Sequence, residues 1–224
     1  GNEDWAWQDV KPYFLKAENN EQFEDEHHAQ GGPLNVTFPN IVSPLEQDFV
    51  AASEALQYKH NPDFNGEIQE GVGIHQATQK NGQRWSSSKA YLHPAMQRPN
   101  LTILTDAAVK RVLLEGDRAS GVELIDGRQL SAKREIIVSA GAVVSPKILM
   151  LSGIGDPAEL SPHGIELKHN LIGVGKNLQD HAAVGAIMST QSRIPWGFSW
   201  PKLPSFAIEA LKYLFTRKGW FSAQ

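Results

Sequence analysis

The residues that could do chemistry in this sequence do not form a metal or hydrolase site. There are eight histidines, but no His-Glu-x-x-His or similar pair, which argues against a zinc site. There is no cysteine, which excludes disulfides and thiolate metal ligands. No Gly-x-Ser-x-Gly elbow occurs, so the best sequence signal for a serine hydrolase is missing. We therefore expect no metal and no hydrolytic triad.

One glycine pattern could in principle bind a dinucleotide. Residues 153–158, Gly-Ile-Gly-Asp-Pro-Ala, match G-x-G-x-x-A, which must follow a strand and open a helix to bring backbone N–H groups to phosphate. Here a predicted helix precedes the pattern, so we interpret Gly153 as the C-terminal cap of that helix. The pairs at 71–73 and 173–175 lack a third small residue at the right offset. The sequence therefore predicts no phosphate-binding glycine loop of its own.

Charge and hydropathy narrow the set of partners. A net charge of −4 and a pI near 6.1 give no reason to expect a nucleic-acid partner. No apolar run approaches the roughly 20 residues that span a bilayer, so no transmembrane segment is expected. The first residues lack the basic and apolar regions of a signal peptide. The absence of cysteine fits a reducing cytoplasm, which is the predicted location.

The outer parts of the sequence are predicted to be largely helical. Asp9 can cap a helix that ends at Ala17, with a proline in its first turn. Ser43-Pro44-Leu45-Glu46 is a capping box, and apolar spacing after it predicts a helix from Pro44 to Leu56. The acidic run from Glu21 to His28 is interpreted as a solvated loop. Apolar residues from Phe206 to Phe215 predict an amphipathic helix that stops at Lys218-Gly219.

The central part is predicted to contain strands. Val109–Leu114 and Gly121–Ile125 are rich in strand-forming residues, and Asp126-Gly127 is a strong hairpin signal. Glu135–Ser139 is short, apolar and β-branched, as is typical of a parallel strand buried on both faces.

A helix is predicted directly after this strand. The turn Ala140-Gly141-Ala142 is followed by Ser145 as N-cap, Pro146 at the first helical position and a helix body to Leu151. The whole pattern indicates an α/β or mixed α+β fold, with the chain crossing between two domains.

Four segments, taken whole, resemble a known family. SAGAVVSPKILMLSGIGDP at 139–157 closely resembles the second signature of the glucose–methanol–choline (GMC) oxidoreductases. GVGKNLQDH at 173–181, TQKNGQRWSSSKAYL at 78–92 and RPNLTILTDAAVKRVLLEG at 98–116 are similar to other family segments, in the family's order. The resemblance covers nearly the whole chain.

This resemblance implies a two-domain FAD enzyme in which hydride passes from an alcohol carbon to the flavin. The electron acceptor, oxygen or a quinone, stays open. By resemblance, the glycine-rich βαβ unit would precede Gly1 and the catalytic histidine would follow Gln224, so we expect an inactive internal fragment with no catalytic residue and no FAD of its own. The longer enzyme would be cytoplasmic or peripheral to the inner membrane.

The resemblance also divides the chain between the two domains. Residues 1–97 would be mostly substrate-domain and connecting segments. Residues 98–180 would be part of the FAD-binding domain, and residues 181–224 would begin a second substrate-domain segment.

The resemblance to the family also implies roles for individual residues of this chain. Val109 matches a strand position whose backbone contacts adenine in similar enzymes, although it could equally be an ordinary core valine. Ala140 and Gly141 match small residues that let the backbone approach the cofactor, with tight helix packing as the alternative. Asp180 would contact the cofactor. His181 would lie near the reactive face of the flavin or make a structural hydrogen bond.

Ala183 bears on the substrate. In choline-oxidising relatives, a glutamate two positions after the histidine of this segment faces the quaternary ammonium; here that position is Ala183. A cation that loses its hydration needs a carboxylate or an aromatic cage. We therefore expect a neutral primary or aromatic alcohol to be preferred over choline, with Trp196 and Trp200 able to offset the loss only in part.

The sequence also bears on two alternative functions and on the self-association of the fragment. The chain could be a natural truncation that acts as a binding or scaffold module. A nicotinamide enzyme is disfavoured, because the glycine fingerprint fails. An apolar strand without its neighbours would leave an open edge, which predicts self-association of the fragment.

Overall fold

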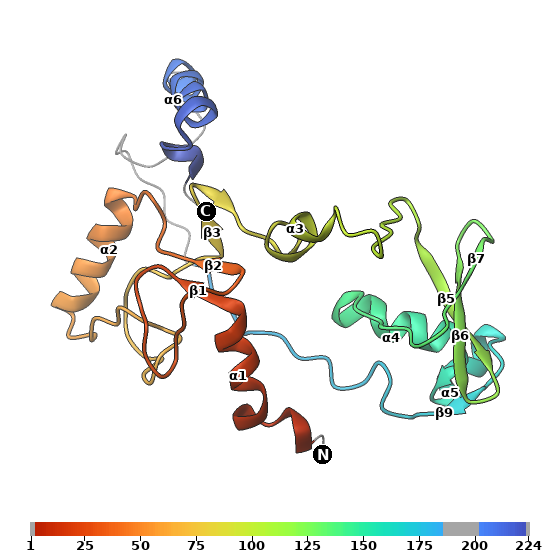
Figure 1. Ribbon diagram of the computed structural model, residues 1–224. Coiled ribbons are helices and arrows are strands. Elements are labelled where there is room, and N and C mark those ends of the chain that lie inside the picture. Colours follow the sequence, from red (N-terminus) through yellow and green to blue (C-terminus); the bar gives the residue numbers. More distant parts are fainter. Residues whose placement is uncertain (1–2, 186–201, 223–224) are drawn as a thin grey trace. The chain divides into compact units, whose positions relative to one another are not determined.

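The structure, a computed structural model, describes residues 3–185 and 202–222 (Figure 1). The chain divides into two compact units, and the mixed helix and strand content confirms the predicted fold class. Unit 1 comprises Gly1–Leu101 and Ser189–Gln224, and unit 2 comprises Thr102–Met188. Unit 2 is therefore inserted, in sequence, between the two stretches of unit 1. Trp196 and Trp200 lie outside the described residues.

Unit 1 carries most of the helices, and they are short. The helical elements of this unit are η1 (Glu3–Trp5), α1 (Trp7–Ala17), α2 (Pro44–Ala55), η2 (Ser88–Leu92, a π-helix), α3 (His93–Ala95), α6 (Leu203–Thr216) and η5 (Trp220–Ser222). Its strands form two small pairs. β1 (Glu18–Asn20) and β2 (Leu34–Val36) pair in parallel, and β3 (Gln79–Lys80) and β4 (Gln83–Arg84) pair antiparallel.

The helices of unit 1 follow the predictions closely. The helix after the capping box ends at Ala55, with the Ser43 backbone N–H donating to Glu46 Oε2 at 2.7 Å. The helix predicted near the C-terminal end is α6, which ends with Arg217 in the left-handed region. The first helix begins at Trp7, two residues before the predicted Asp9 cap. Asp9 instead lies in the first turn, where its negative charge interacts favourably with the positive end of the helix dipole but does not cap the helix.

The interior of unit 1 is largely polar. Asn20, Asn35 and Gln79 are buried, and the Asn35 Nδ2 group donates to the Gln79 carbonyl at 2.6 Å and to Glu21 Oε1 at 2.8 Å. The Gln79 Nε2 group donates to the Ser222 carbonyl, which joins the two stretches of this unit. Because a buried amide without partners is costly, these hydrogen bonds hold the segments around Asn35, Gln79 and Ser222 together, although Gln79 Oε1 is buried without a partner.

His28 corrects one prediction. The run from Glu21 to His28 was predicted to be a solvated loop, but the imidazole is only 3% exposed. Its Nε2 atom lies 3.0 Å from Asp63 Oδ2 and its Nδ1 atom lies 3.3 Å from Glu18 Oε1. Burial, the largest single effect, lowers the pKa of His28, but the hydrogen bonds and charges of the two carboxylates together raise that pKa above its ordinary value.

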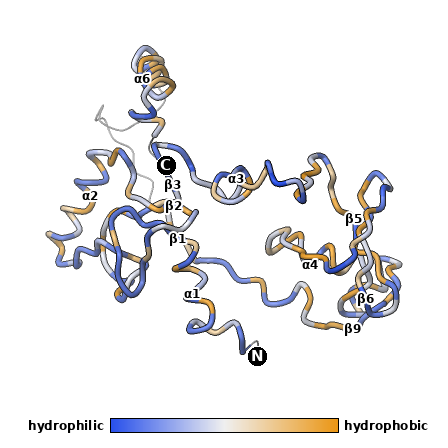
Figure 2. The backbone as a smooth tube through the Cα atoms, viewed as in Figure 1, coloured by the Kyte–Doolittle hydropathy of each residue, from blue (hydrophilic) through white to orange (hydrophobic). Residues whose placement is uncertain are grey.

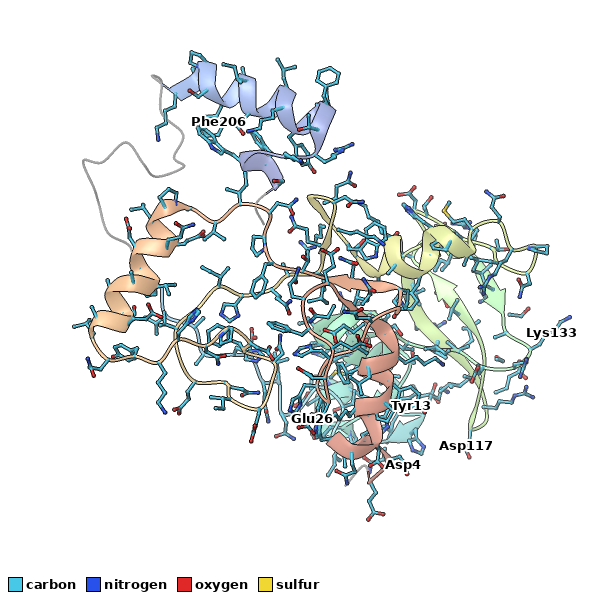
Figure 3. All side chains as sticks on the ribbon, turned by 60° about the vertical axis from the view of Figure 1, so that its left-hand side comes forward. Asp4, Tyr13, Glu26, Asp117, Lys133 and Phe206 are labelled. Atoms are coloured by element: carbon cyan, nitrogen blue, oxygen red, sulfur yellow. The ribbon has the colours of Figure 1, made fainter. Side chains whose placement is uncertain are left out.

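Unit 2 is built on a three-stranded antiparallel meander. β5 (Val109–Glu115), β6 (Arg118–Leu124) and β7 (Gln129–Ser131) are hydrogen-bonded in that order. The Asp126-Gly127 turn joins β6 to β7 as predicted, with Gly127 at φ 88° and Asp126 Oδ1 accepting from the Arg128 backbone N–H. Figure 3 labels Asp117 in the tight turn between β5 and β6.

The prediction of a parallel strand at residues 135–139 is wrong. These residues have no regular secondary structure, and Ile137 is 76% exposed. A strand exists only as part of a hydrogen-bonded ladder, and none of the described strands runs beside this segment. Its β-branched residues favour an extended conformation, but they do not supply a neighbouring strand for hydrogen bonding.

The helix after this segment, α4 (Gly141–Leu151), begins earlier than predicted. Ala140 is its N-cap and Ser145 lies inside it, where its Oγ atom accepts from the Ala140 backbone N–H at 3.0 Å. Pro146 therefore lies in the helix interior, where it removes one backbone bond. The predicted end is confirmed, because Gly153 follows with φ 84°.

The rest of unit 2 packs on the end of this helix. β8 (Ile154–Gly155) and β9 (His169–Asn170) pair in parallel, and α5 (Pro157–Leu160) and η3 (Ser161–His163) lie between them in sequence. The dinucleotide-like pattern at 153–158 thus follows a helix, as predicted, and its last two residues open the single turn of α5. The small apolar core of the unit consists of Val112, Leu124, Ile148, Leu160 and Val174.

Candidate functional site

The N-terminus of α4 presents free backbone donors. Ala140 makes no side-chain cap, so the first-turn N–H groups have no capping acceptor. Gly141 has φ 87°, and a Cβ atom built on it would meet nothing within 4 Å. Both residues are exposed. The open space and the positive end of the helix dipole suit the close approach of an anionic group such as a phosphate.

A pocket of about 550 Å³ lies beside this helix. Its walls are mainly apolar and come from α4, from the turn after η3 and from the 173–178 segment. The lining residues are Ala142, Val143, Pro146, Lys147, Met150, Leu151, His163, Ile165, Gly175, Lys176 and Leu178. The fold therefore brings the 139–157 and 173–181 segments, which carry the family resemblance, to one place.

Two lysines add positive charge to this pocket. Lys147 comes from α4, and Lys176 comes from the 173–178 segment. Lys176 Nζ also hydrogen-bonds to Glu159 and lies 3.9 Å from Asp156 Oδ2. The bond to Glu159 raises the pKa of Lys176, so this ammonium stays charged.

The segment that continues from the pocket carries the predicted substrate-side residues. Gly175, at φ 77°, packs against α4, since a Cβ atom there would lie 3.5 Å from Met150 Sδ. Asp180, His181 and Ala183 follow without regular secondary structure and are all exposed. The Asp180 Oδ1 atom accepts a hydrogen bond from the His181 backbone N–H at 2.8 Å.

Val109 stands apart from the other predicted site residues. It opens β5, pairs with Leu124 across the sheet and does not line the pocket. The sequence interpretation missed Lys147, Met150 and Lys176. Their contribution depends on two segments folding against each other, and no local spacing signals that.

The comparisons with known proteins identify the family. Residues 1–183 match the profile described as GMC oxidoreductase. The chain belongs to this family. It is 42% identical over 229 residues to an alcohol dehydrogenase [acceptor] from Pseudomonas putida, a match that covers 100% of this chain and 42% of the relative. An oxygen-dependent choline dehydrogenase from Brucella anthropi is 44% identical over 187 residues, which cover 82% of this chain and 34% of the relative.

Solved structures of related oxidoreductases have the same fold as this chain over the part that they share with it. A pyridoxine 4-oxidase from Mesorbium loti superposes with a TM-score of 0.69 at 32% identity, covering 76% of this chain and 34% of that one. An FAD-dependent oxidoreductase from Chaetomium thermophilum superposes with a TM-score of 0.81 at 25% identity, covering 100% of this chain and 42% of that one. The chain spans less than half the length of these relatives.

The residues present fit part of an FAD site. The exposed N-terminus of α4, with its open Gly141 backbone, can take an anionic part of the cofactor.

None of the helices in residues 3–185 and 202–222 is long and apolar enough to cross a membrane.

Proposed function

We propose that this chain is an internal part of an FAD-dependent enzyme that oxidises the CH–OH group of an alcohol. The family membership supports the class of enzyme, and the Pseudomonas putida relative, which matches along the whole chain, is named an alcohol dehydrogenase. When bound, FAD supplies the hydride acceptor of the reaction. Oxygen or a quinone would be the electron acceptor, and by resemblance to the family the catalytic histidine would belong to a segment outside these residues.

The residues of this chain would position the cofactor. We assign the backbone of Ala140 and Gly141 to close contact with FAD, because the helix N-terminus offers uncapped donors and no Cβ blocks the approach. The Val109 backbone would contact the adenine, and Asp180 would contact the cofactor where the chain leaves the FAD-binding domain. All four residues lie in unit 2, Thr102–Met188, which supports the assignment of most of residues 98–180 to that domain.

The substrate preference rests on one observation, the side chain at position 183. His181 and Ala183 would line the substrate pocket, and residues 181–185, His-Ala-Ala-Val-Gly, contain no carboxylate. A carboxylate about 4 Å from a quaternary ammonium contributes about 4 kcal/mol at an effective dielectric near 20. Without it, the enzyme should prefer a neutral primary or aromatic alcohol to choline.

The test is reduction of the flavin in the longer protein that carries this chain. Bleaching of the flavin absorbance under anaerobic conditions is followed with a series of neutral alcohols and with choline. Rapid bleaching by a neutral alcohol supports the proposal. Bleaching by neither substrate class would refute the alcohol-oxidising function, and a preference of about tenfold or more for choline would refute the role of Ala183.

A further inference from the structure

His28 lies buried where three segments of unit 1 meet. Its own loop, which follows β1, is coloured mostly in the hydrophilic range in Figure 2, and Figure 3 labels Glu26 in this loop. Glu18, at the start of β1, lies beside ring atom Nδ1, and Asp63 lies beside Nε2. Because each ring nitrogen has polar partners of its own, the contacts of His28 determine which nitrogen gains and loses a proton.

The side-chain amide of Asn20 has a fixed orientation beside this ring. Its Oδ1 atom accepts hydrogen bonds from the backbone N–H groups of Gln22 and Phe23, both at 3.1 Å. An amide oxygen can accept these bonds and an amide nitrogen cannot, so the two ends of the amide cannot be exchanged. The Nδ2 group of Asn20 therefore directs a donor at His28 Nδ1, which lies 3.1 Å away.

The Nε2 atom of His28 is the nitrogen that keeps its hydrogen. Asp63 Oδ2 lies 3.0 Å from Nε2, and no donor among the described residues contacts this atom. An ionised carboxylate can only accept, so the neutral ring carries its hydrogen on Nε2. The other oxygen of Asp63 accepts from the Asn65 backbone N–H at 3.0 Å, which holds the carboxylate in place. Asp63 therefore stays bonded to His28 in both protonation states.

The Nδ1 atom, in contrast, faces an acceptor as well as the Asn20 donor. Both carboxylate oxygens of Glu18 lie 3.3 Å from Nδ1. A protonated Nδ1 donates to Glu18, and the Asn20 amide then bonds to Gln76 Oε1 at 3.0 Å and to Glu18 Oε1 at 3.2 Å. A deprotonated Nδ1 accepts from Asn20 instead, and its lone pair faces the Glu18 carboxylate, which repels it.

We propose that the proton on His28 Nδ1 is a switch that holds Glu18 at the junction of α1 and β1. Glu18 is both the C-cap residue of α1 and the first residue of β1. With a charged ring, its carboxylate binds Nδ1 and also accepts from the Ala29 backbone N–H at 3.0 Å. Loss of the proton removes the first contact, so this junction loosens while the contact of His28 with Asp63 persists. The proposal does not depend on alcohol oxidation.

The charges around the ring favour the protonated state. The titratable groups of the surrounding segments are Glu18, Asp63, Asp25, Glu26, Glu67 and His27. Asp25 Oδ1 accepts from the His28 backbone N–H at 2.9 Å, whereas Phe23 and Gln76 contribute no charge. Burial opposes the charge of the ring, but the two carboxylates at the nitrogens outweigh it and raise the pKa of His28. The switch therefore operates above the ordinary value of about 6.5.

The experiment is NMR spectroscopy of the full 224-residue chain, with ¹⁵N in the histidine rings, over a range of pH. The spectrum of His28→Gln assigns the signals of this ring by their absence. We expect Nδ1 alone to lose its hydrogen as the pH rises, while Nε2 keeps its own. The hydrogen-exchange protection factor of the Ala29 amide should fall by about tenfold or more through the same transition, because a hydrogen bond between charged groups is lost.

Two matched variants separate the two carboxylates. Glu18→Gln removes the charge that stabilises the proton on Nδ1, so it should lower the pKa of His28 and remove most of the pH dependence at Ala29. Asp63→Asn also removes one negative charge and should lower the pKa of His28. It should nevertheless keep the fall in Ala29 protection, displaced to lower pH, because Glu18 is still present. Circular dichroism of each variant checks that the fold persists.

Three results would overturn the proposal. One is a ring that loses its hydrogen from Nε2 and keeps the hydrogen on Nδ1. Another is an Ala29 protection factor that stays constant while His28 titrates. The third is a pH dependence at Ala29 that is the same in Glu18→Gln as in the unmodified chain. The first two results need no variant, so they test the proposal even if a substitution prevents folding.

Discussion

The Ser152 hydroxyl joins the end of α4 to β5, an edge strand of the meander in unit 2. Its Oγ atom accepts from the Val112 backbone N–H at 2.8 Å and donates to the Ile148 carbonyl at 2.6 Å. Ser152 and Val112 are both buried. Because water cannot replace a buried partner, this hydroxyl fixes the position of α4 on β5.

Replacing this serine should destabilise unit 2. Ser152→Ala leaves the Val112 N–H buried without an acceptor, which costs about 1–3 kcal/mol in the free energy of unfolding. Urea denaturation followed by circular dichroism measures the change. The control is Ser131→Ala at the exposed end of β7, which should change the free energy of unfolding by less than about 0.5 kcal/mol. Equal effects of the two substitutions would contradict this role of Ser152.

His28 should make unit 1 less stable at alkaline pH. The pKa of His28 is raised in the folded state, so the stabilising charge is fully present below the ordinary value of about 6.5 and is lost as the pH rises through the folded pKa. The free energy of unfolding should therefore fall as the pH rises above about 6.5, because the folded pKa lies above the unfolded one. His28→Gln should reduce this fall, whereas His93→Gln, at an exposed position, should keep it. A pH profile unchanged by His28→Gln would count against the ion pairs with Glu18 and Asp63.

The isolated chain should bind no FAD. It has no G-x-G-x-x-G loop, so the donors at the N-terminus of α4 alone must offset the desolvation of the diphosphate. Purified chain incubated with FAD and passed through a desalting column should be colourless. A yellow preparation that contains one FAD per chain would contradict this prediction.

Self-association of the isolated chain should come from unit 2. The strand from which the sequence predicted this behaviour does not form, but Ile137, Val143 and Leu178 are exposed there. Exposed apolar side chains near an apolar pocket favour contacts between copies and binding of the dye ANS. Sedimentation and ANS fluorescence test this at micromolar concentration. A clean monomer without dye fluorescence would be the contrary result.

A carboxylate at position 183 should shift the substrate preference. In the longer protein, Ala183→Glu should raise kcat/KM for choline relative to a neutral alcohol of similar size, by up to about a thousandfold. Ala182→Glu places the same charge one residue away and should have a much smaller effect. Equal shifts in both variants would indicate a general effect of charge and would remove Ala183 from the substrate pocket.

Local signals in the sequence predicted local structure well. The capping box at Ser43, the Asp126-Gly127 turn and the glycine at 153 each depend on neighbouring residues only, and each does in the structure what it predicts. The family segments likewise sufficed to identify the family, because their order along the chain is specific.

Predictions that needed a distant partner failed or stayed incomplete. Residues 135–139 have strand composition but no neighbouring strand among the described residues, and the buried His28 contacts Glu18 and Asp63, which no local pattern around His28 signals. Lys176 joins the pocket because its segment folds back on α4. The roles of Val109, Ala140, Gly141, Asp180, His181 and Ala183 toward the cofactor and the substrate stay predictions.

Because unit 1 consists of two stretches separated in sequence by unit 2, the two units can complete their folding at different times during translation. Gln79 and Ser222 are hydrogen-bonded across 143 positions, with all of unit 2 encoded between them. The β5–β6–β7 meander closes through short hairpins, and such low contact order lets it fold as soon as it emerges. In unit 1, by contrast, the Gln79 Nε2 group gains the Ser222 carbonyl as its acceptor only when translation reaches that residue. A nascent chain that pauses before Ser222 should therefore be better protected from proteolysis in the inserted unit than in the segment around Gln79.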